Sequence, residues 1–260
     1  MSDQRAVSTG ITLVGLALTL TACGPAPGWK VRELAASPVP PQPEQALQRC
    51  NQALAAKAAL KPERATPADP TNFGERQQRD VFGRQVPHAP QLIVLHETVV
   101  SEADTLKLFQ TAHPRDEDQA SYHLLITPKG ERLRLVADEQ RAYGAGMSAW
   151  GDMSVRIRPT SPGSINNVAL HLSVVTPADG RGDASAHSGY TPAQYQAAAA
   201  QVLLWQATYG IPLNQLTTHK AVDQSKTRTD PRSFDLGHFL SVHHQLAASC
   251  GLQAFAAERY

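Results

Sequence analysis

The stretch that decides the fold is residues 91–96, which read Gln-Leu-Ile-Val-Leu-His. Four consecutive apolar residues, two of them β-branched, are typical of a short strand that is buried on both faces in the middle of a sheet. The run ends in His96, so the predicted strand delivers a histidine at its carboxyl end.

Strand and helix signals alternate on the carboxyl side of this stretch. They predict a helix, a hairpin around Pro128-Lys129-Gly130, a second buried strand, a long helix and a terminal helix. In chain order the segments are 101–111, 122–127 paired with 132–136, 168–175, 192–209 and 236–249. We therefore expect an α/β fold in which helices cover a mixed central β-sheet.

The helix over 192–209 has the clearest boundaries. Thr191 is a good N-cap, Gln194 completes a capping box, and Gly210 ends the helix. We expect one face of this helix to cover the sheet. That face comprises Tyr195, Ala198, Ala199, Val202 and Tyr209.

The amino terminus predicts export. An apolar run over 11–20 is too short to span a bilayer but fits the central region of a signal peptide. Residues 20–23, Leu-Thr-Ala-Cys, resemble the lipobox of bacterial lipoproteins, in which the cysteine is lipidated; the alternative is an ordinary signal peptide with a chance cysteine. We expect residues 1–23 to be the signal and Cys23 to anchor the chain in a membrane. Gly24 then favours the outer membrane, facing the periplasm.

The rest of the chain divides by composition. We predict a Pro-rich tether over 24–44, a helical or irregular extension over 45–89, a catalytic domain over 90–250 and a tail over 251–260. The formal net charge of +1 argues against a nucleic-acid partner, and we expect a monomer.

Two cysteines remain in the exported chain if Cys23 carries lipid. In an oxidising compartment, Cys50 and Cys250 are expected to form a disulfide that ties the start of the folded part to its end. The alternative is two free thiols.

Three polar residues predict a metal site. His96 ends the buried strand, His219 follows a short strand over 216–218, and Asp230 lies eleven residues later. Two histidines and one carboxylate are a common ligand set for catalytic zinc (Zn2+). With ten histidines in the chain, the trio alone is a weak signal.

Six segments in unbroken order strengthen the prediction of a metal site. Together they resemble the N-acetylmuramoyl-L-alanine amidase type 2 family over residues 90–240. The resemblance implies an amidase type 2-like fold, a zinc site of His96, His219 and Asp230, and a peptidoglycan or muropeptide substrate. It also implies cleavage of the amide between the lactyl group of N-acetylmuramic acid and L-alanine. The segments are 93–98, 121–126 with Gly130, 141–148, 190–195 with 209–212, 218–220, and 229–231 with 234–235.

The chain departs from the family pattern at three positions. His171 stands where many relatives carry a glutamate, the presumed general base, so it is either a base or a structural substitution. Arg228 stands where the family has a lysine. Arginine keeps a cation for the oxyanion, but it cannot shuttle protons. Gly144 replaces a histidine of the middle motif.

The remaining site predictions are Tyr122 and Ser148 as substrate-binding residues. Tyr122 can equally pack in the sheet. His238, His243 and His244 lie on the terminal helix and are expected to be solvated. Two further hypotheses stay open: a zinc-containing, catalytically weak protein that binds muropeptides, and a metal-free lipoprotein with a structural role.

Overall fold

The structure of the protein is a computed structural model, and it describes residues 39–257. The predicted signal peptide, Cys23 and most of the predicted tether lie outside the described residues. Within the described part, no helix is both long and apolar enough to cross a lipid bilayer.

A six-stranded mixed sheet forms the centre of the molecule, with strand order β1-β5-β4-β7-β3-β8. β3 pairs in parallel with both β7 and β8, whereas β4 and β5 form the antiparallel hairpin that the sequence predicted. A small second sheet pairs β2 with β6. The strands are β1 (Glu63–Ala65), β2 (Phe73–Glu75), β3 (Leu92–Glu97), β4 (Leu124–Ile126), β5 (Arg132–Arg134), β6 (Gln140–Ala142), β7 (Ala169–Val174) and β8 (Leu216–Thr218).

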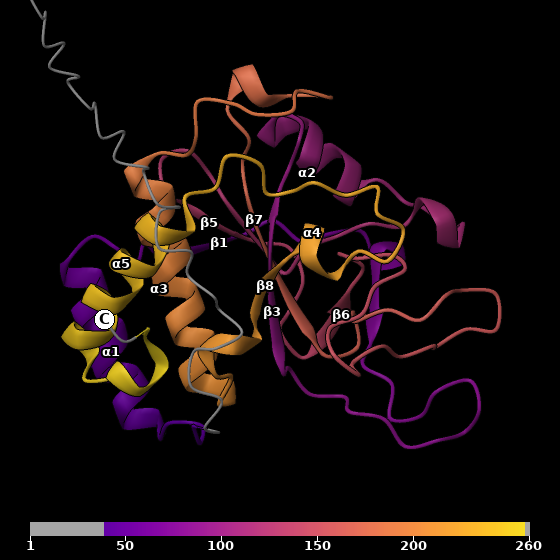
Figure 1. Cartoon of the computed structure of the whole chain (residues 1–260), viewed down its shortest axis with the longest axis horizontal. Coiled ribbons are helices and arrows are strands. Elements are labelled where there is room, and N and C mark those ends of the chain that lie inside the picture. The colour runs from indigo at the N-terminus through magenta and orange to yellow at the C-terminus, as the bar shows by residue number, and fades with distance from the viewer. Residues whose placement is uncertain (1–38, 258–260) are drawn as a thin grey trace, which may run out of the picture.

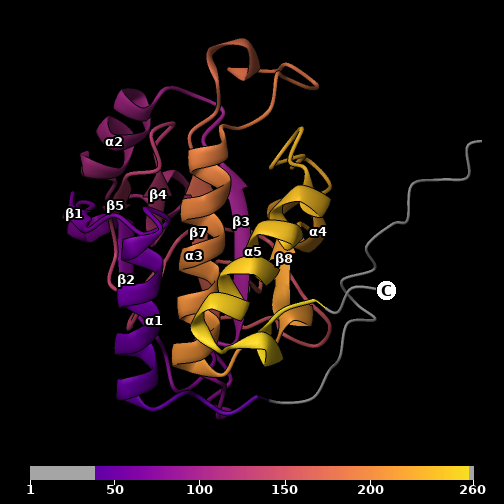
Figure 2. The ribbon, with the colours of Figure 1, turned by 90° about the vertical axis from the view of Figure 1, so that its left-hand side faces the viewer.

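Helices cover the sheet, so the predicted α/β class is confirmed (Figure 1). α1, α3 and α5 lie together over one face (Figure 2). The helices are α1 (Glu44–Ala56), α2 (Glu102–Gln110), α3 (Pro192–Tyr209), α4 (His219–Val222) and α5 (Leu236–Cys250). Short 3-10 helices span η2 (Pro70–Asn72), η3 (Asp116–Asp118), η4 (Ala178–Gly180), η5 (Leu213–Gln215) and η6 (Gln253–Phe255).

α3 has the boundaries that its caps predict. Thr191 and Gln194 form the capping box, and Gly210 ends the helix in the left-handed conformation with φ of 69°. Tyr195, Ala198, Ala199 and Val202 of the expected face are buried, and Tyr209 packs against the same cluster. Burial extends beyond that face, because every residue from Ala197 to Ala207 is buried. The sheet covers one side of α3, while α1 and α5 pack against it from the other.

The segments outside the predicted 90–250 domain belong to the same fold. Cys50 of α1 and Cys250 of α5 form a disulfide, and α1 packs on α5 and α3. β1 extends the main sheet by pairing with β5. Phe255, in the predicted tail, is 1% exposed and lies in the main hydrophobic cluster.

β3 sends its side chains alternately to the two faces of the sheet. Ile93 and Leu95 join the cluster that α3 and α5 cover. Val94 instead joins a second cluster, which contains Val222 of α4. The next two residues follow this alternation, so His96 points to the α4 face and Glu97 to the α3 face.

Candidate metal centre

Parallel pairing of β3 with β8 brings the two histidines together. Leu95 lies opposite Thr218 in the register, so His96 and His219 follow at the carboxyl ends of neighbouring strands. His219 is also the first residue of α4, which Thr218 caps by accepting a hydrogen bond from the Ala221 N–H. Asp230 arrives on the loop after α4, where its carbonyl oxygen accepts a hydrogen bond of 2.9 Å from the backbone N–H of Lys220.

The three side chains converge on one point. Nδ1 of His219 lies 3.0 Å from Oδ1 of Asp230, and Nδ1 of His96 lies 3.4 Å from Oδ2. All three residues are buried, and their ligand atoms lie within 4.8 Å of one another. Tetrahedral zinc with bonds of about 2.0–2.1 Å places its ligand atoms about 3.4 Å apart, which is close to the observed separations.

The protonation states also fit a metal centre. Burial lowers the pKa of His96 to about 4, so its imidazole is neutral at pH 7, the form that binds metals. Burial by itself would raise the pKa of Asp230, but the neighbouring imidazoles of His219 and His96 outweigh it and hold the pKa below its ordinary value. Nδ1 of His96 is buried and has no hydrogen-bond partner within residues 39–257. The trio therefore fits zinc.

His171 lies behind His96 rather than in front of it. It is fully buried on β7, and its Nδ1 lies 2.9 Å from Nε2 of His96. Because His96 directs Nδ1 toward Asp230, His171 meets the edge of the ring that faces away from the candidate metal. A general base must reach the substrate or its attacking water, so this position favours the structural alternative for His171 over the role of base.

Gly144 and His171, two of the departures from the family pattern, pack against each other. A Cβ atom on Gly144 would lie 2.4 Å from Cγ and Nδ1 of the His171 ring. Any larger residue at position 144 would therefore displace that ring, so the glycine makes room for His171.

Tyr122 packs directly against His96. Its ring stacks on His96 with the centroids 4.6 Å apart, and Phe109 of α2 meets it edge-on at 5.1 Å. Burial raises the pKa of Tyr122 above its ordinary value, so its hydroxyl stays protonated and can donate a hydrogen bond.

Arg228 comes from an exposed loop that Asp223 organises. The Asp223 carboxylate accepts hydrogen bonds from the backbone N–H groups of Ser225, Thr227 and Arg228, at 2.9, 2.7 and 2.8 Å. Burial is the main cause of the pKa shifts at His96 and Tyr122, and the positive charge of Arg228 also acts on both, lowering each pKa. The charge of Arg228 therefore acts on the candidate metal centre.

Ser148 is buried and its hydroxyl is engaged within the protein, so the structure gives no support to its predicted substrate-binding role. Ser148 is only 1% exposed. The hydroxyl donates a hydrogen bond to the Gly146 carbonyl at 3.0 Å and accepts one from the Ile165 N–H at 3.1 Å. These bonds join the two ends of the loop between β6 and β7.

The sequence reasoning missed a buried ionic cluster under the site. Oε1 of Glu97 accepts hydrogen bonds from the backbone N–H and Nε of Arg232, and Oε2 accepts from Tyr190 and Thr176. The Arg232 guanidinium also donates to the carbonyl groups of Gly180, Gly182 and Ala184. A glutamate at the end of an apolar strand, with an arginine two residues after a metal ligand, is the signal that could have revealed it.

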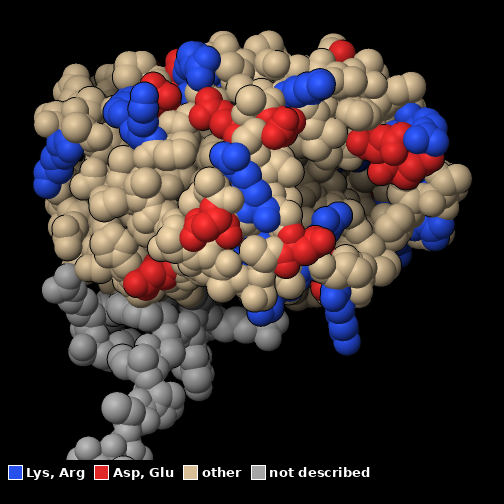
Figure 3. Space-filling model, turned by 90° about the horizontal axis from the view of Figure 1, so that it is seen from above, with Lys and Arg blue, Asp and Glu red and all other residues tan. Residues whose placement is uncertain are grey.

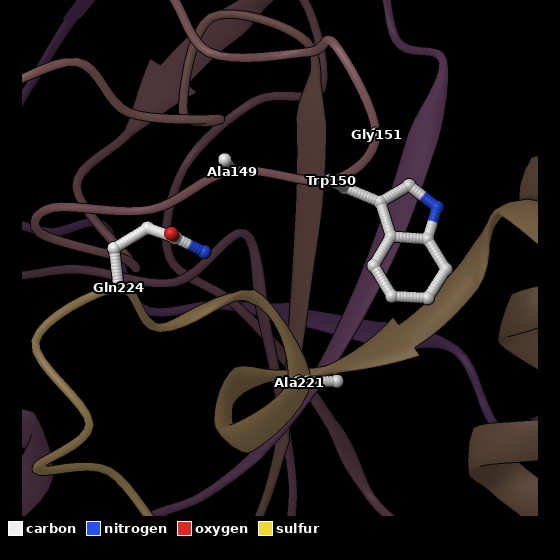
Figure 4. A pocket seen from close by; sticks show the side chains of 5 residues that line it. All are labelled: Ala149, Trp150, Gly151, Ala221 and Gln224. Atoms are coloured by element: carbon white, nitrogen blue, oxygen red, sulfur yellow. The ribbon is translucent and has the colours of Figure 1, made fainter.

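The face above the carboxyl ends of the strands is hollowed, and charged side chains flank the hollow (Figure 3). A separate pocket of about 490 Å³ lies at α4, the helix that begins with His219. The Trp150 ring and the Gln224 side chain flank it (Figure 4). The other lining residues are Ala149, Gly151 and Ala221.

Comparison with known protein families assigns this chain to a class of enzymes. The chain belongs to the N-acetylmuramoyl-L-alanine amidase family, whose pattern matches residues 84–233, more than half of its length. The protein is thus an amidase by class. No curated protein sequence matches it.

One solved structure shares the fold, and two others are similar at lower scores. The crystal structure of a selenomethionine AmpD derivative is similar with a TM-score of 0.51 and 23% identity, covering 70% of this chain and 95% of that one. The solution structure of Citrobacter freundii AmpD gives 0.45 and 22%, covering 69% and 89%. AmpDH3 from Pseudomonas aeruginosa in complex with anhydromuramic pentapeptide gives 0.46 and 21%, covering 61% and 62%.

Proposed function

We propose that this protein is a zinc-dependent N-acetylmuramoyl-L-alanine amidase that hydrolyses the lactyl–L-alanine amide bond of peptidoglycan or muropeptides. The observation that carries the proposal is the buried trio of His96, His219 and Asp230, with an unpartnered His96 Nδ1, in a chain of the amidase family. These three residues would hold the ion. When bound, zinc supplies Lewis acidity, which lowers the pKa of water toward neutrality and polarises an amide carbonyl.

The other side chains of the site supply charge and orientation. Arg228 donates to the oxyanion that develops on the scissile carbonyl, where a charge-assisted hydrogen bond is strongest. Tyr122 stacks on His96 and keeps its ring in place, while its protonated hydroxyl can donate to the substrate. Glu97 takes no part in proton transfer, because Arg232, Tyr190 and Thr176 occupy its carboxylate on the other face of β3.

One observation favours a second candidate function. His171 is engaged behind His96, so the position that holds the presumed base in many relatives supplies no base here. A zinc-containing protein that binds muropeptides and turns them over slowly would have this arrangement.

One experiment distinguishes the amidase from the slow muropeptide-binding protein. The purified protein is incubated with zinc and a defined muropeptide, and the products are analysed by mass spectrometry. Release of the free stem peptide, and its loss in a His219→Ala variant, supports the amidase. Binding without release supports the second candidate. Absence of zinc in the purified protein and no binding of added zinc would contradict both.

We further propose that Cys23 anchors the protein in the outer membrane, facing the periplasm. The support is the apolar run over 11–20 followed by the lipobox-like residues 20–23. Metabolic labelling with a radioactive fatty acid should mark the wild type but not a Cys23→Ser variant. An unlabelled wild type would contradict the proposal.

A further inference from the structure

We infer that His171 is a positioning residue, which accepts a hydrogen bond from Nε2–H of His96 and thereby holds His96 in the tautomer whose Nδ1 is free to bind a metal. The inference rests on the proposed metal centre. It assigns the histidine a task that differs from general-base catalysis.

The neighbours of the His96 ring determine which of its nitrogens carries the proton. A neutral imidazole carries one N–H, and a nitrogen that binds a metal must have none. Nδ1 of His96 faces Asp230 at 3.4 Å, on the side where His219 also converges. The proton must therefore reside on Nε2, which lies 2.9 Å from Nδ1 of His171. His171 is then the acceptor of this bond.

His123 holds the His171 ring in place. The His171 ring stacks on that of His123 at 5.8 Å with an interplanar angle of 11°. His123 in turn accepts a hydrogen bond from the His171 backbone N–H at 2.9 Å through Nδ1, and its Nε2 lies 3.1 Å from the Gln140 carbonyl oxygen. The proton of His123 is thus on Nε2, and its ring is fixed at both nitrogens.

The His171 ring fills a tightly bounded space. Gly144 lies against the ring so closely that a Cβ atom would approach Cγ to 2.4 Å. Nε2 of His171 is buried and has no hydrogen-bond partner in the described part of the chain. The ring therefore keeps a conformation that leaves one of its nitrogens unsatisfied, while its other nitrogen meets the candidate ligand.

Metal-binding histidines commonly donate their second N–H to a carboxylate or carbonyl group, which sets the tautomer and raises affinity for the metal. Here an imidazole takes that place. The contrary hypothesis is that His171 only fills space between Gly144 and His96. A variant that keeps the shape of the His171 ring but lacks its hydrogen-bond acceptor distinguishes the positioning role from the space-filling role.

The experiment measures zinc affinity of the purified protein by competition with a chromogenic chelator. His171→Phe keeps an aromatic ring without an acceptor, and we expect zinc affinity to fall about 10–100-fold. His171→Asn places an amide oxygen near the Nδ1 position, and we expect it to recover most of that loss. His243→Phe is the matched control, because His243 is equally buried but bonds to Gln206; it should leave zinc affinity unchanged.

Two results would overturn the inference: wild-type affinity in a folded His171→Phe variant, or equal losses in the folded Phe and Asn variants. If a variant fails to fold, ¹⁵N NMR of the wild-type imidazoles still decides, because a proton on Nδ1 of metal-free His96 would also overturn it. Failure of the proposed function looks different, since the wild type itself would then bind no zinc.

Discussion

Oε1 of Glu97 accepts two hydrogen bonds from Arg232, one from the backbone N–H at 2.9 Å and one from Nε at 2.5 Å. Glu97 follows the ligand His96, and Arg232 lies two residues after the ligand Asp230. The pair therefore ties the loop that carries one ligand to the strand that carries another.

Removing one partner of this pair should be costly. We expect Glu97→Ala to lower the free energy of unfolding by about 3–5 kcal/mol, because it leaves the buried Arg232 charge without its partner. Urea denaturation measures the loss. Glu102→Ala is the control: Glu102 is half-buried and pairs with the exposed Arg64 at 3.7 Å, so its loss should change stability by less than about 1 kcal/mol.

The same pair predicts a pH dependence. Burial by itself would raise the pKa of Glu97, but hydrogen bonds from Arg232 and Tyr190 outweigh it, and the pKa lies below its ordinary value. The stability that Glu97 contributes is therefore present above its unfolded pKa of about 4.3 and is lost as the pH falls below it. Thermal unfolding between pH 6 and pH 3 should show a smaller acid-induced decrease in Glu97→Gln than in the wild type. Equal slopes would contradict this.

Gly144 and His171 should behave as a coupled pair. We expect Gly144→Ala to weaken zinc binding although it touches no ligand, because the added methyl group displaces the His171 ring. Combining it with His171→Asn, a smaller side chain, should restore part of the affinity. A double-mutant cycle on zinc affinity measures the coupling, and strict additivity would show that the two positions are independent.

Arg228 should act on turnover more than on binding. We expect Arg228→Ala to lower kcat about 10²–10³-fold, the usual cost of losing one donor to a developing oxyanion, with little change in KM or zinc content. Lys226→Ala in the same exposed loop is the control. An equal loss in both variants would point to the loop rather than to the guanidinium.

The loop itself depends on Asp223. Burial opposes ionisation, but hydrogen bonds from Ser225 and from the backbone of Arg228 and Thr227 hold the pKa of Asp223 at about 2. Asp223→Asn should therefore loosen the loop and lower kcat about tenfold, the equivalent of 1.4 kcal/mol, while zinc affinity stays unchanged. Asp152→Asn, at an exposed position in another loop, should have no effect.

Local signals were sufficient for much of this protein. The apolar run that ends in His96 identified the central strand, because a strand buried on both faces needs no alternation of polar and apolar residues. Thr191, Gln194 and Gly210 marked the ends of α3, since caps satisfy backbone groups through neighbours in the chain. The order of the motifs then indicated the ligand trio before any distance was known.

Contacts between elements decided the rest. His243 was expected to be solvated, yet it is fully buried and bonds to Gln206 of α3; Ser148 was expected at the substrate, yet it joins two ends of a loop. Whether His171 faced the substrate or the back of His96 depended on the pairing of β7 with β3 and on the space beside Gly144. A sequence pattern reports which side of an element is apolar and how the chain turns. Which side chain meets which nitrogen across a sheet depends on packing between residues far apart in the chain, and only the tertiary structure determines that.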